Sequence, residues 1–365
     1  MRIVHLSDIH LSKDNFPEFE NNYRRALINT LKEEHEIKKI DVIAITGDLV
    51  DKGGHSLLEY AKFTGCSDPY EIFEQEFINP IKSALNFQNK HFLFIPGNHD
   101  ISENEILWID EKKLQDEEVA GKINDLLQEN RAVFNKTNKR IELFKKFEYR
   151  FHNSITDNYQ CSNNESTFIL KYSEEINVGF ALINDSWRCS TCHLHKYKDK
   201  KLYFGEQQLY DALNVLEASN TTCNIILTHH PLSTYAEESL VKRALVNKSY
   251  HLHLFGDQHK QEYTSYLTPD GNCFGIMARV ALNRPDEPES KWQPGFHIID
   301  IDFYNANIEL ITFYKYIHDR CRFAKDTDTA DDGCDRQKHK LSFNPVLKPA
   351  KLRKENFNKN DFIKS

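Results

Sequence analysis

The residues of this chain whose types and spacing could do chemistry are acidic, histidine and amide side chains grouped in short motifs. Carboxylate, imidazole and amide oxygen groups are the ligands that hard and borderline divalent metal ions prefer. Each motif alone is common in proteins, so the information lies in the order of the whole set, which indicates a metal site. In chain order the motifs are Asp8-Ile9-His10, Gly47-Asp48 with Asp51 shortly after it, Gly97-Asn98-His99-Asp100, His229-His230-Pro231 and Gly256-Asp257-Gln258-His259.

Each motif follows a short apolar run that is typical of a buried β-strand. The runs are RIVHLS, DVIAIT, HFLFIP, NIILT and YHLHLF. Side chains that follow the strands of one sheet converge at an edge of that sheet, where open α/β folds place their functional sites. We therefore expect the motifs to come together in space.

The order and composition of these motifs resemble those of the calcineurin-like metallophosphoesterase superfamily, over roughly residues 1–315. The resemblance implies an α/β fold built as a four-layer αββα sandwich of two mixed sheets, with a helical insertion. It also implies hydrolysis of phosphate esters at a pair of divalent metal ions. Two such ions about 3.5–4 Å apart lower the pKa of a bound water and clamp the phosphoryl oxygens.

The resemblance assigns seven residues as ligands of the two metal ions, with Asp48 bridging them. They are Asp8, His10, Asp48, Asn98, His229, Asp257 and His259. Family members usually carry a histidine at the position of Asp257, and the carboxylate here favours Mn²⁺ or Mg²⁺ over Zn²⁺ at the second site, or weakens that site. Mn²⁺ is the expected metal, with Mg²⁺, Fe, Zn²⁺ and Ni²⁺ as alternatives. His230 is expected to lie behind the ligands.

The resemblance also assigns proton transfer to the leaving group to His99. An imidazole suits this role because its unperturbed pKa lies near working pH. A neighbouring carboxylate would hold the ring protonated and oriented, and both Asp51 and Asp100 are candidates. The sequence Gly47-Asp48-Leu49-Val50-Asp51-Lys52-Gly53 favours Asp51, since some family members pair this second aspartate with the catalytic histidine. The predicted catalytic residues are therefore His99, Asp51 and the bridging Asp48.

The chain has 365 residues, of which 39% are hydrophobic, enough to bury a sizeable core. Its formal net charge of −8 does not suggest a general binder of polyanions, although bound metal ions would offset charge locally and a nuclease is not excluded. The first strand follows Met1 directly and no apolar run reaches the roughly 18 residues of a membrane span, so we expect a cytoplasmic protein without a membrane partner. Its eight cysteines are then expected to be mostly reduced.

Apolar periodicity predicts a β-α-β-α-β start, which favours a mostly parallel inner sheet with helices outside it. The expected strands in this part are 2–7, 41–46 and 91–96, and the expected helices are 21–38, 55–63 and 69–85. From residue 166 the pattern returns to strands, beginning with a hairpin. The later strands are 166–172, 178–184, 224–228, 250–255, 261–267, 273–278, 295–304 and 308–316, and the later helices are 205–219 and 236–247.

We expect one metallophosphoesterase domain over residues 1–316. Within it, residues 102–150 are rich in charged and amide side chains and predict two or three inserted helices. This insertion is either a cap that limits substrate size or a solvated decoration. After residue 316 the apolar periodicity fades, and residues 317–365 predict a tail or linker. This segment would either pack on the core or join a partner subunit of a larger assembly.

The cysteines raise the question of a second, structural metal site. Four thiolates, or two thiolates with two imidazoles, would suit a structural Zn²⁺. The chain lacks two C-x-x-C pairs, so free thiols are favoured and zinc is the lesser alternative. The residues concerned are Cys189, Cys192, His193, His195, Cys321 and Cys334.

The motifs favour a metal-dependent hydrolase of phosphodiester bonds, acting either on a small molecule or, as a nuclease, on DNA or RNA. The P-G-N-H-D form of the third motif resembles the phosphodiesterase and nuclease branches more than the R-G-N-H-E form of protein phosphatases. One alternative is a phosphomonoesterase or protein phosphatase, which the G-D-L-V-D-K-G sequence supports a little. Another is a catalytically weak, metal-binding scaffold subunit of a larger assembly, which Asp257 keeps open.

Overall fold

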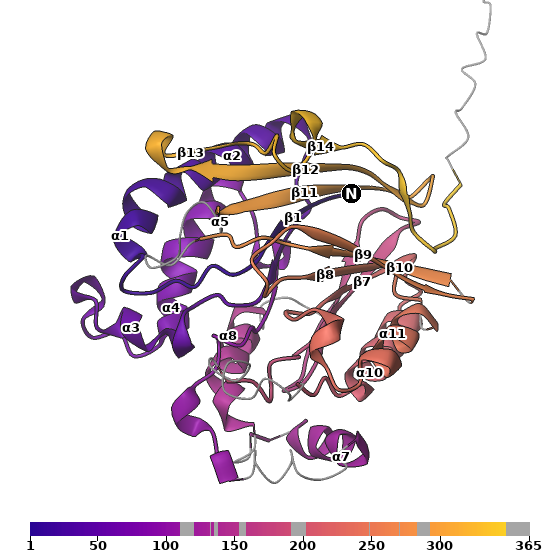
Figure 1. Cartoon of the computed structure of the whole chain (residues 1–365), viewed down its shortest axis with the longest axis horizontal. Helices are drawn as coiled ribbons and strands as arrows, with labels where there is room; N and C mark the ends of the chain where they lie inside the picture. The colour runs from indigo at the N-terminus through magenta and orange to yellow at the C-terminus, as the bar shows by residue number, and fades with distance from the viewer. Residues whose placement is uncertain are drawn as a thin grey trace, which may run out of the picture.

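Two β-sheets lie face to face in the computed structural model, with helices on their outer faces (Figure 1). Apolar side chains from both sheets fill the space between them. Two further apolar clusters join each sheet to its own helices. The predicted four-layer α/β sandwich is thereby confirmed. The structure describes residues 1–109, 120–131, 133–134, 138–152, 158–190, 202–247, 249–269, 271–282 and 293–347.

The first sheet has a parallel centre and an antiparallel flank. Its strands are β1 (Arg2–Leu6), β2 (Val42–Thr46), β3 (Phe92–Ile95), β11 (Gly295–Asp302), β12 (Asn307–Ile317), β13 (Arg322–Lys325), β14 (Cys334–Asp335) and β15 (His339–Lys340). They follow the order β13-β12-β11-β1-β2-β3, and β14 and β15 also pair with β12. Because β1, β2 and β3 are parallel, their carboxyl ends lie at one edge.

The second sheet is also mixed. Its strands are β4 (Tyr159–Cys161), β5 (Ser166–Lys171), β6 (Asn177–Leu182), β7 (Cys223–Leu227), β8 (Leu252–Phe255), β9 (Glu262–Thr268) and β10 (Gly271–Met277). They follow the order β4-β5-β6-β7-β8-β10-β9. Strands β6, β7, β8 and β10 are parallel, and β5 and β9 are antiparallel to their neighbours.

The helices of the described residues are mostly short. They are α1 (Phe16–Glu18), α2 (Arg24–Ile37), α3 (His55–Leu58), α4 (Pro69–Phe73), α5 (Asn79–Leu85), α7 (Ala120–Asn130), α8 (Glu142–His152), α10 (Gln207–Ala218) and α11 (Glu238–Asn247). A π-helical turn precedes α2 and another joins α4 to α5. None of these helices has the length and apolarity of a membrane span.

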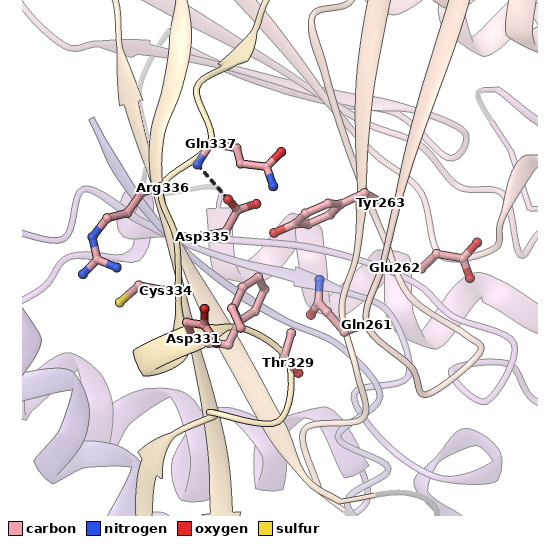
Figure 2. A pocket seen from close by; sticks show the side chains of 11 residues that line it. Gln261, Glu262, Tyr263, Thr329, Asp331, Cys334, Asp335, Arg336 and Gln337 are labelled. Carbon is pink, nitrogen blue, oxygen red and sulfur yellow. Dashed lines mark hydrogen bonds between the residues drawn. The ribbon is translucent and has the colours of Figure 1, made fainter.

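The segment after β12 lies against the sheets. Strand β13 pairs with the end of β12, and β14 and β15 pair further along it. Leu341 and Phe343 are buried in the core between the sheets. Residues 329–337 face the start of β9 across a pocket (Figure 2). The domain boundary at residue 316 stays a prediction, and residues 348–365 lie outside the described part of the chain.

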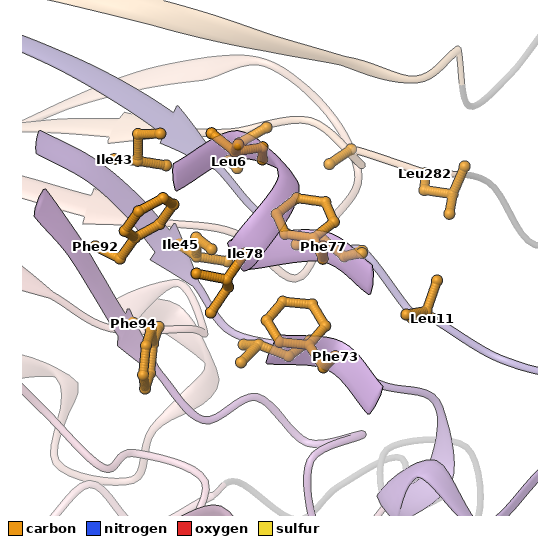
Figure 3. Close-up of a cluster of buried hydrophobic side chains, with 14 of the residues drawn as sticks. Leu6, Leu11, Ile43, Ile45, Phe73, Phe77, Ile78, Phe92, Phe94 and Leu282 are labelled. Carbon is orange, nitrogen blue, oxygen red and sulfur yellow. The ribbon is translucent and has the colours of Figure 1, made fainter. Parts of the chain in front are cut away.

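Alternation along the central strands explains why both faces of the first sheet are apolar. In β2, Ile43 and Ile45 pack with Phe77 of the helical layer (Figure 3). The intervening Val42 and Ala44 contribute to the core between the sheets. Successive side chains of a strand point to opposite faces, so a strand buried on both faces is apolar at every position. This explains the continuous apolar run that precedes each motif.

The predicted insertion contains helix α7 and most of helix α8. Residues 110–119 lie outside the described residues, so the predicted count of two or three inserted helices stays a prediction. Helix α7 packs through Ile123 and Leu127 on Trp187 of the second-sheet side. Whether the insertion caps the metal site stays a prediction.

A buried ion-pair network ties β1 to β11 and to α2. Arg2 donates from Nε and Nη2 to the two carboxylate oxygens of Asp300, at 3.0 and 2.8 Å. Its Nη1 lies 3.1 Å from Glu34 Oε2. All three side chains are almost fully buried, so removal of one carboxylate leaves buried charge with less compensation.

Asp300→Ala is therefore expected to lower the free energy of unfolding by about 2–3 kcal/mol, since Glu34 still partly compensates Arg2. Chemical denaturation followed by circular dichroism measures this change. The exposed Asp319→Ala is the matched control and should change stability by less than about 0.5 kcal/mol. Equal effects of the two substitutions would show that the network does not stabilise the fold.

Candidate metal centre

The motif loops meet at the carboxyl ends of the central strands. The backbone N–H of Asp8 donates to the carbonyl of Gly47 at 3.1 Å, and that of His10 donates to the carbonyl of Asp48 at 2.8 Å. The N–H of His99 donates to Asp48 Oδ1 at 2.7 Å. Loops from three neighbouring strands are thus bonded to one another, and the side chains that follow those strands converge, as expected for this edge of a sheet.

Two glycines allow the close approach of these loops. A Cβ atom on Gly97 would lie 2.1 Å from Asp48 Oδ1. Gly47 has a φ of +90°, and a Cβ there would lie 2.4 Å from His229 Nδ1. A side chain at either position would displace a candidate ligand, which explains why the motifs contain glycine.

The first candidate metal position is formed by Asp8, His10 and His259. His259 Nε2 lies 3.3 Å from Asp8 Oδ1 and 3.4 Å from His10 Nε2. Asp8 Oδ1 is buried and has no hydrogen-bond partner among the described residues. A buried carboxylate oxygen that accepts no hydrogen bond and faces two imidazole nitrogens fits a divalent cation.

Asp48 lies between the two candidate positions. Its Oδ2 lies 3.5 Å from His10 Nε2 and 3.4 Å from His229 Nε2. Its other oxygen, Oδ1, accepts the hydrogen bond from the N–H of His99. One carboxylate oxygen therefore faces a histidine of each group, which is the placement expected of a bridging ligand.

The second candidate position is formed around His229. Asn98 Oδ1 lies 3.1 Å and Asp257 Oδ1 lies 4.0 Å from His229 Nε2. His229 Nδ1 donates to the carbonyl of Thr46 at 2.7 Å, so Nε2 is left with the lone pair that a metal ion needs. The chemistry of this donor set, two carboxylates with an imidazole and an amide, fits a second divalent cation.

Five of the seven candidate ligands have a left-handed backbone. Their φ angles lie between +48° and +72°, a region that residues other than glycine rarely adopt. Each such residue costs about 1–3 kcal/mol and persists only where the surrounding structure enforces it. These residues are Asp8, His10, Asp48, Asp257 and His259.

His99 pairs with Asp51. Its Nδ1 lies 2.6 Å from Asp51 Oδ1, and its ring packs edge-on against His10 with centroids 4.6 Å apart. Because Asp51 fixes the proton on Nδ1, Nε2 is the nitrogen that would exchange a proton with substrate. The ring is thus oriented beside the first candidate metal position.

Asp100, the other candidate partner of His99, binds backbone groups instead. Its carboxylate accepts hydrogen bonds from the backbone N–H groups of Leu49, Val50 and Gly97. Burial and the Asp48 carboxylate raise the pKa of Asp100 to about 7. Asp100 therefore ties the second motif loop to the third, and the structure places Asp51 beside His99.

Asp185 is a residue of this site that the sequence analysis missed. It follows β6, and its carboxylate accepts from the backbone N–H groups of His229 and His230 at 2.9–3.1 Å. It also lies 3.2 Å from His230 Nδ1 and accepts from the hydroxyl of Tyr235. The apolar run before Asp185 followed by an acidic residue is the same signal that marks the five motifs.

Asp185→Asn should loosen the turn that carries His229 and lower metal affinity by about 10- to 100-fold, the usual effect of changing a group that orients a ligand. Metal titration monitored by calorimetry measures this affinity. Substitution of the partly exposed Glu238 by Gln, on the helix that follows the turn, is the control and should bind metal like the wild type. An unchanged affinity in Asp185→Asn would contradict the positioning role.

The charges of the cluster shift its pKa values in opposite directions. Burial raises the pKa of Asp8, but the neighbouring His259 outweighs burial and lowers it to about 2. Burial lowers the pKa of His229, but the Asp48 carboxylate raises it to about 10. Burial raises the pKa of Asp257. The histidines thus serve as counter-charges to the carboxylates, and a divalent cation would replace their protons.

The cysteines proposed for a structural zinc lie in different surroundings. Cys189 is buried, with its Sγ 3.8 Å from His230 Nε2. Cys334 lies in β14 beside Thr312, and Cys321 follows the end of β12. The ligand groups found among the described residues contain no cysteine. Cys192, His193 and His195 lie outside the described residues, so the zinc site stays a prediction.

Comparisons with known proteins identify a curated relative of this chain. The curated metallophosphoesterase-like protein YydB of Bacillus subtilis (strain 168), described as uncharacterized, is 23% identical over 325 residues, which cover 86% of this chain and 59% of YydB. The chain thus spans 59% of the length of that relative.

Solved structures that match this chain include the calcineurin-like phosphoesterase YfkN from Bacillus subtilis. It has 13% identity and a TM-score of 0.41, and the match covers 94% of this chain and 90% of that one. A Vps29 mutant from Entamoeba histolytica has 10% identity and a TM-score of 0.31 over 93% of this chain and 99% of that one. Residues 1–261 match the family model described as calcineurin-like phosphoesterase, and the chain belongs to that family.

Proposed function

We propose that this chain is a metal-dependent hydrolase of phosphodiester bonds that works with two divalent cations. The observation that carries the proposal is the position of Asp48 Oδ2, within 3.5 Å of a histidine from each candidate metal position. A single carboxylate oxygen shared in this way is what a dinuclear centre requires. Mn²⁺ is the proposed metal, because four of the seven proposed ligands offer oxygen.

Each proposed ligand has a defined place. Asp8, His10 and His259 would hold the first cation, and Asn98, His229 and Asp257 would hold the second, with Asp48 between them. The pair supplies an activated water and neutralises charge on the phosphate. The side chains of His259 and Asp257 are 14% and 18% exposed, so the cluster is open to a substrate on this side.

His99 is the proposed general acid. The Asp51 carboxylate holds Nδ1, which orients the ring. A protonated Nε2 can then give its proton to the leaving oxygen. The short bond from the His99 N–H to Asp48 fixes the distance between this acid and the metal ligands.

The choice of a diester over a monoester rests on the motifs. The third motif reads P-G-N-H-D, and the arginines of the protein phosphatase motifs are absent from the second and third motifs. A monoester carries more negative charge than a diester and needs more positive charge at the site. Lys52 is the one lysine or arginine of these two motifs, and its side chain is exposed.

Hydrolysis of bis(p-nitrophenyl) phosphate, p-nitrophenyl phosphate, and single- and double-stranded DNA in Mn²⁺ tests the proposal. We expect the wild type to cleave the small diester faster than the monoester, and Asp48→Asn to cleave neither. DNA cleavage by the wild type alone would extend the activity to nucleic acid. Faster cleavage of the monoester would replace the diesterase with a phosphomonoesterase.

Asp257→His tests the departure from the usual ligand set. A neutral imidazole removes one buried carboxylate and supplies a softer ligand, so Zn²⁺ affinity at the second position should rise about tenfold. Competitive titration with Zn²⁺ and Mn²⁺ measures this change, with the neighbouring Gln258→Asn as the control. A loss of affinity for both metals would show that the site needs the carboxylate.

A catalytically weak scaffold is the second candidate, and Asp257 is the observation that favours it. Burial raises the pKa of this carboxyl, so without metal it competes poorly for a cation. If Asp257→His binds both metals and still shows no turnover on any phosphate ester, the scaffold is supported and the hydrolase is not.

A further inference from the structure

A pocket of about 750 Å³ lies between the start of β9 and the segment 329–337 (Figure 2). One wall comes from the edge strand of the second sheet, and the opposite wall comes from the chain that follows β13 and pairs with β12. None of the seven proposed metal ligands lines the pocket. Its volume suits a small ligand, because most small-molecule sites enclose about 300–1,000 Å³.

Gln261 presents an unpaired donor to this pocket. Its Nε2 is buried and has no hydrogen-bond partner among the described residues. Its Oε1 lies 3.1 Å from His297 Nδ1, which fixes the amide orientation. An unsatisfied buried N–H destabilises the fold, so a ligand that supplies an acceptor here offsets that cost.

The orientation of Gln261 is held from behind by a chain of buried hydrogen bonds. With His297 Nδ1 donating to Gln261, His5 Nδ1 donates to His297 Nε2 at 2.9 Å, and His5 Nε2 lies 2.9 Å from the Thr46 hydroxyl, which also lies 3.4 Å from the carbonyl of Leu6. The carbonyl of Thr46 accepts from His229 Nδ1. Each donor in this chain sets the next, so Gln261 keeps its N–H₂ group toward the pocket.

The remaining lining groups define the ligand. Asp335 faces Tyr263 across the pocket (Figure 2). Its carboxylate accepts from the backbone N–H of Gln337 at 2.8 Å and lies 2.9 Å from His339 Nε2, and the remaining lone pairs of its oxygens can accept a further hydrogen bond. The rings of Tyr263 and Phe313 supply apolar surface, with centroids 6.3 Å apart. Asp331 adds another negative charge, and Arg336, the cation of this lining, is paired with Asp332 at 2.8 Å, so an anion is disfavoured.

We propose that this pocket binds the edge of a nucleobase. A nucleobase is a neutral, planar ring that carries an acceptor next to an N–H donor. The acceptor of the base would accept a hydrogen bond from the N–H₂ of Gln261, and its N–H would donate to the Asp335 carboxylate. The ring would pack on Tyr263 and Phe313. The site goes beyond the proposed hydrolysis, because binding here needs no metal ion and no turnover.

Uridine and 3-methyluridine form a matched pair of probes. The methyl group of the second blocks the ring N–H that would donate to Asp335 and leaves the rest of the molecule unchanged. Isothermal titration calorimetry with the wild type should show binding of uridine and at least about tenfold weaker binding of 3-methyluridine. Uridine 5′-monophosphate in a parallel titration separates a free nucleoside from a nucleotide as the source of the base.

Three variants assign the binding to this pocket. Gln261→Glu keeps an oxygen for His297 and removes the donor, Gln261→Leu removes the whole amide, and Asp335→Asn removes the acceptor charge. Each should weaken uridine binding by about tenfold, whereas Glu309→Gln, exposed on β12, should bind like the wild type. Circular dichroism confirms that the variants are folded, and the two different Gln261 variants guard against one of them misfolding.

Asp48→Asn separates this proposal from the proposed function. It should lose hydrolysis and keep uridine binding. No binding of uridine by the wild type up to about 1 mM, equal binding of 3-methyluridine, or unchanged binding in both Gln261 variants would each overturn the assignment.

Discussion

Asp48→Asn is expected to abolish turnover of bis(p-nitrophenyl) phosphate, with a loss of at least about 10³-fold. The amide keeps the shape of the side chain but removes the charge that one oxygen, Oδ2, presents to His10 and His229. An amide has one oxygen and no negative charge, so it cannot hold two cations together. The amide also carries an N–H₂ group in place of one carboxylate oxygen. In one orientation this group faces the proposed cations, and in the other it faces the N–H of His99, which needs an acceptor.

Steady-state hydrolysis and metal content by mass spectrometry measure the effect of this change. We expect fewer than two metal ions per chain in Asp48→Asn and two in the wild type. Asp319→Asn, an exposed substitution of the same kind, is the matched control and should keep full activity. Full occupancy and wild-type turnover in Asp48→Asn would remove the bridge on which the dinuclear proposal depends.

His99→Ala is expected to slow hydrolysis by about 10²–10⁴-fold while both metal ions stay bound. The imidazole is not among the proposed ligands, and its Nδ1 is held by Asp51 at 2.6 Å. Loss of the ring therefore removes proton donation without removing a metal contact. Asp51→Asn should slow the same step by a smaller factor, because the ring remains but is less well held.

The leaving group gives the sharper test of His99. p-Nitrophenolate leaves without a proton, whereas an alkoxide needs one, so His99→Ala should harm an alkyl diester far more than the p-nitrophenyl diester. His91→Ala, at a partly exposed histidine before β3, is the matched control. Equal losses on both substrates would show that His99 binds or positions substrate and does not supply the proton.

The strands and the motifs that follow them could be predicted because they are local signals. Each central strand is a mostly apolar run, and its bounds came within two residues of the observed ones. The short strands β4, β13, β14 and β15 were not predicted. Strands β14 and β15 have two residues each and contain Cys334 and His339, and their pairing depends on β12, which is distant in the chain. A strand of this kind carries no apolar period of its own.

Within the site, the sequence could name residue types but could not decide between neighbours. Asp51 and Asp100 were both open as partners of His99, and backbone hydrogen bonds made the difference, since Asp100 is occupied by three N–H groups. Asp185 was missed because only the fold shows that its carboxylate meets the turn at His229. Such choices depend on backbone directions that no side-chain pattern records.

The left-handed backbone of five proposed ligands has a consequence for engineering. Glycine adopts these φ angles without steric cost, so a chain selected for folding alone would favour glycine at such positions. The aspartates and histidines there instead trade thermal resistance for reactivity. With metal ions removed, a variant with glycine at one of them, such as Asp257→Gly, should therefore melt at a higher temperature than the wild type.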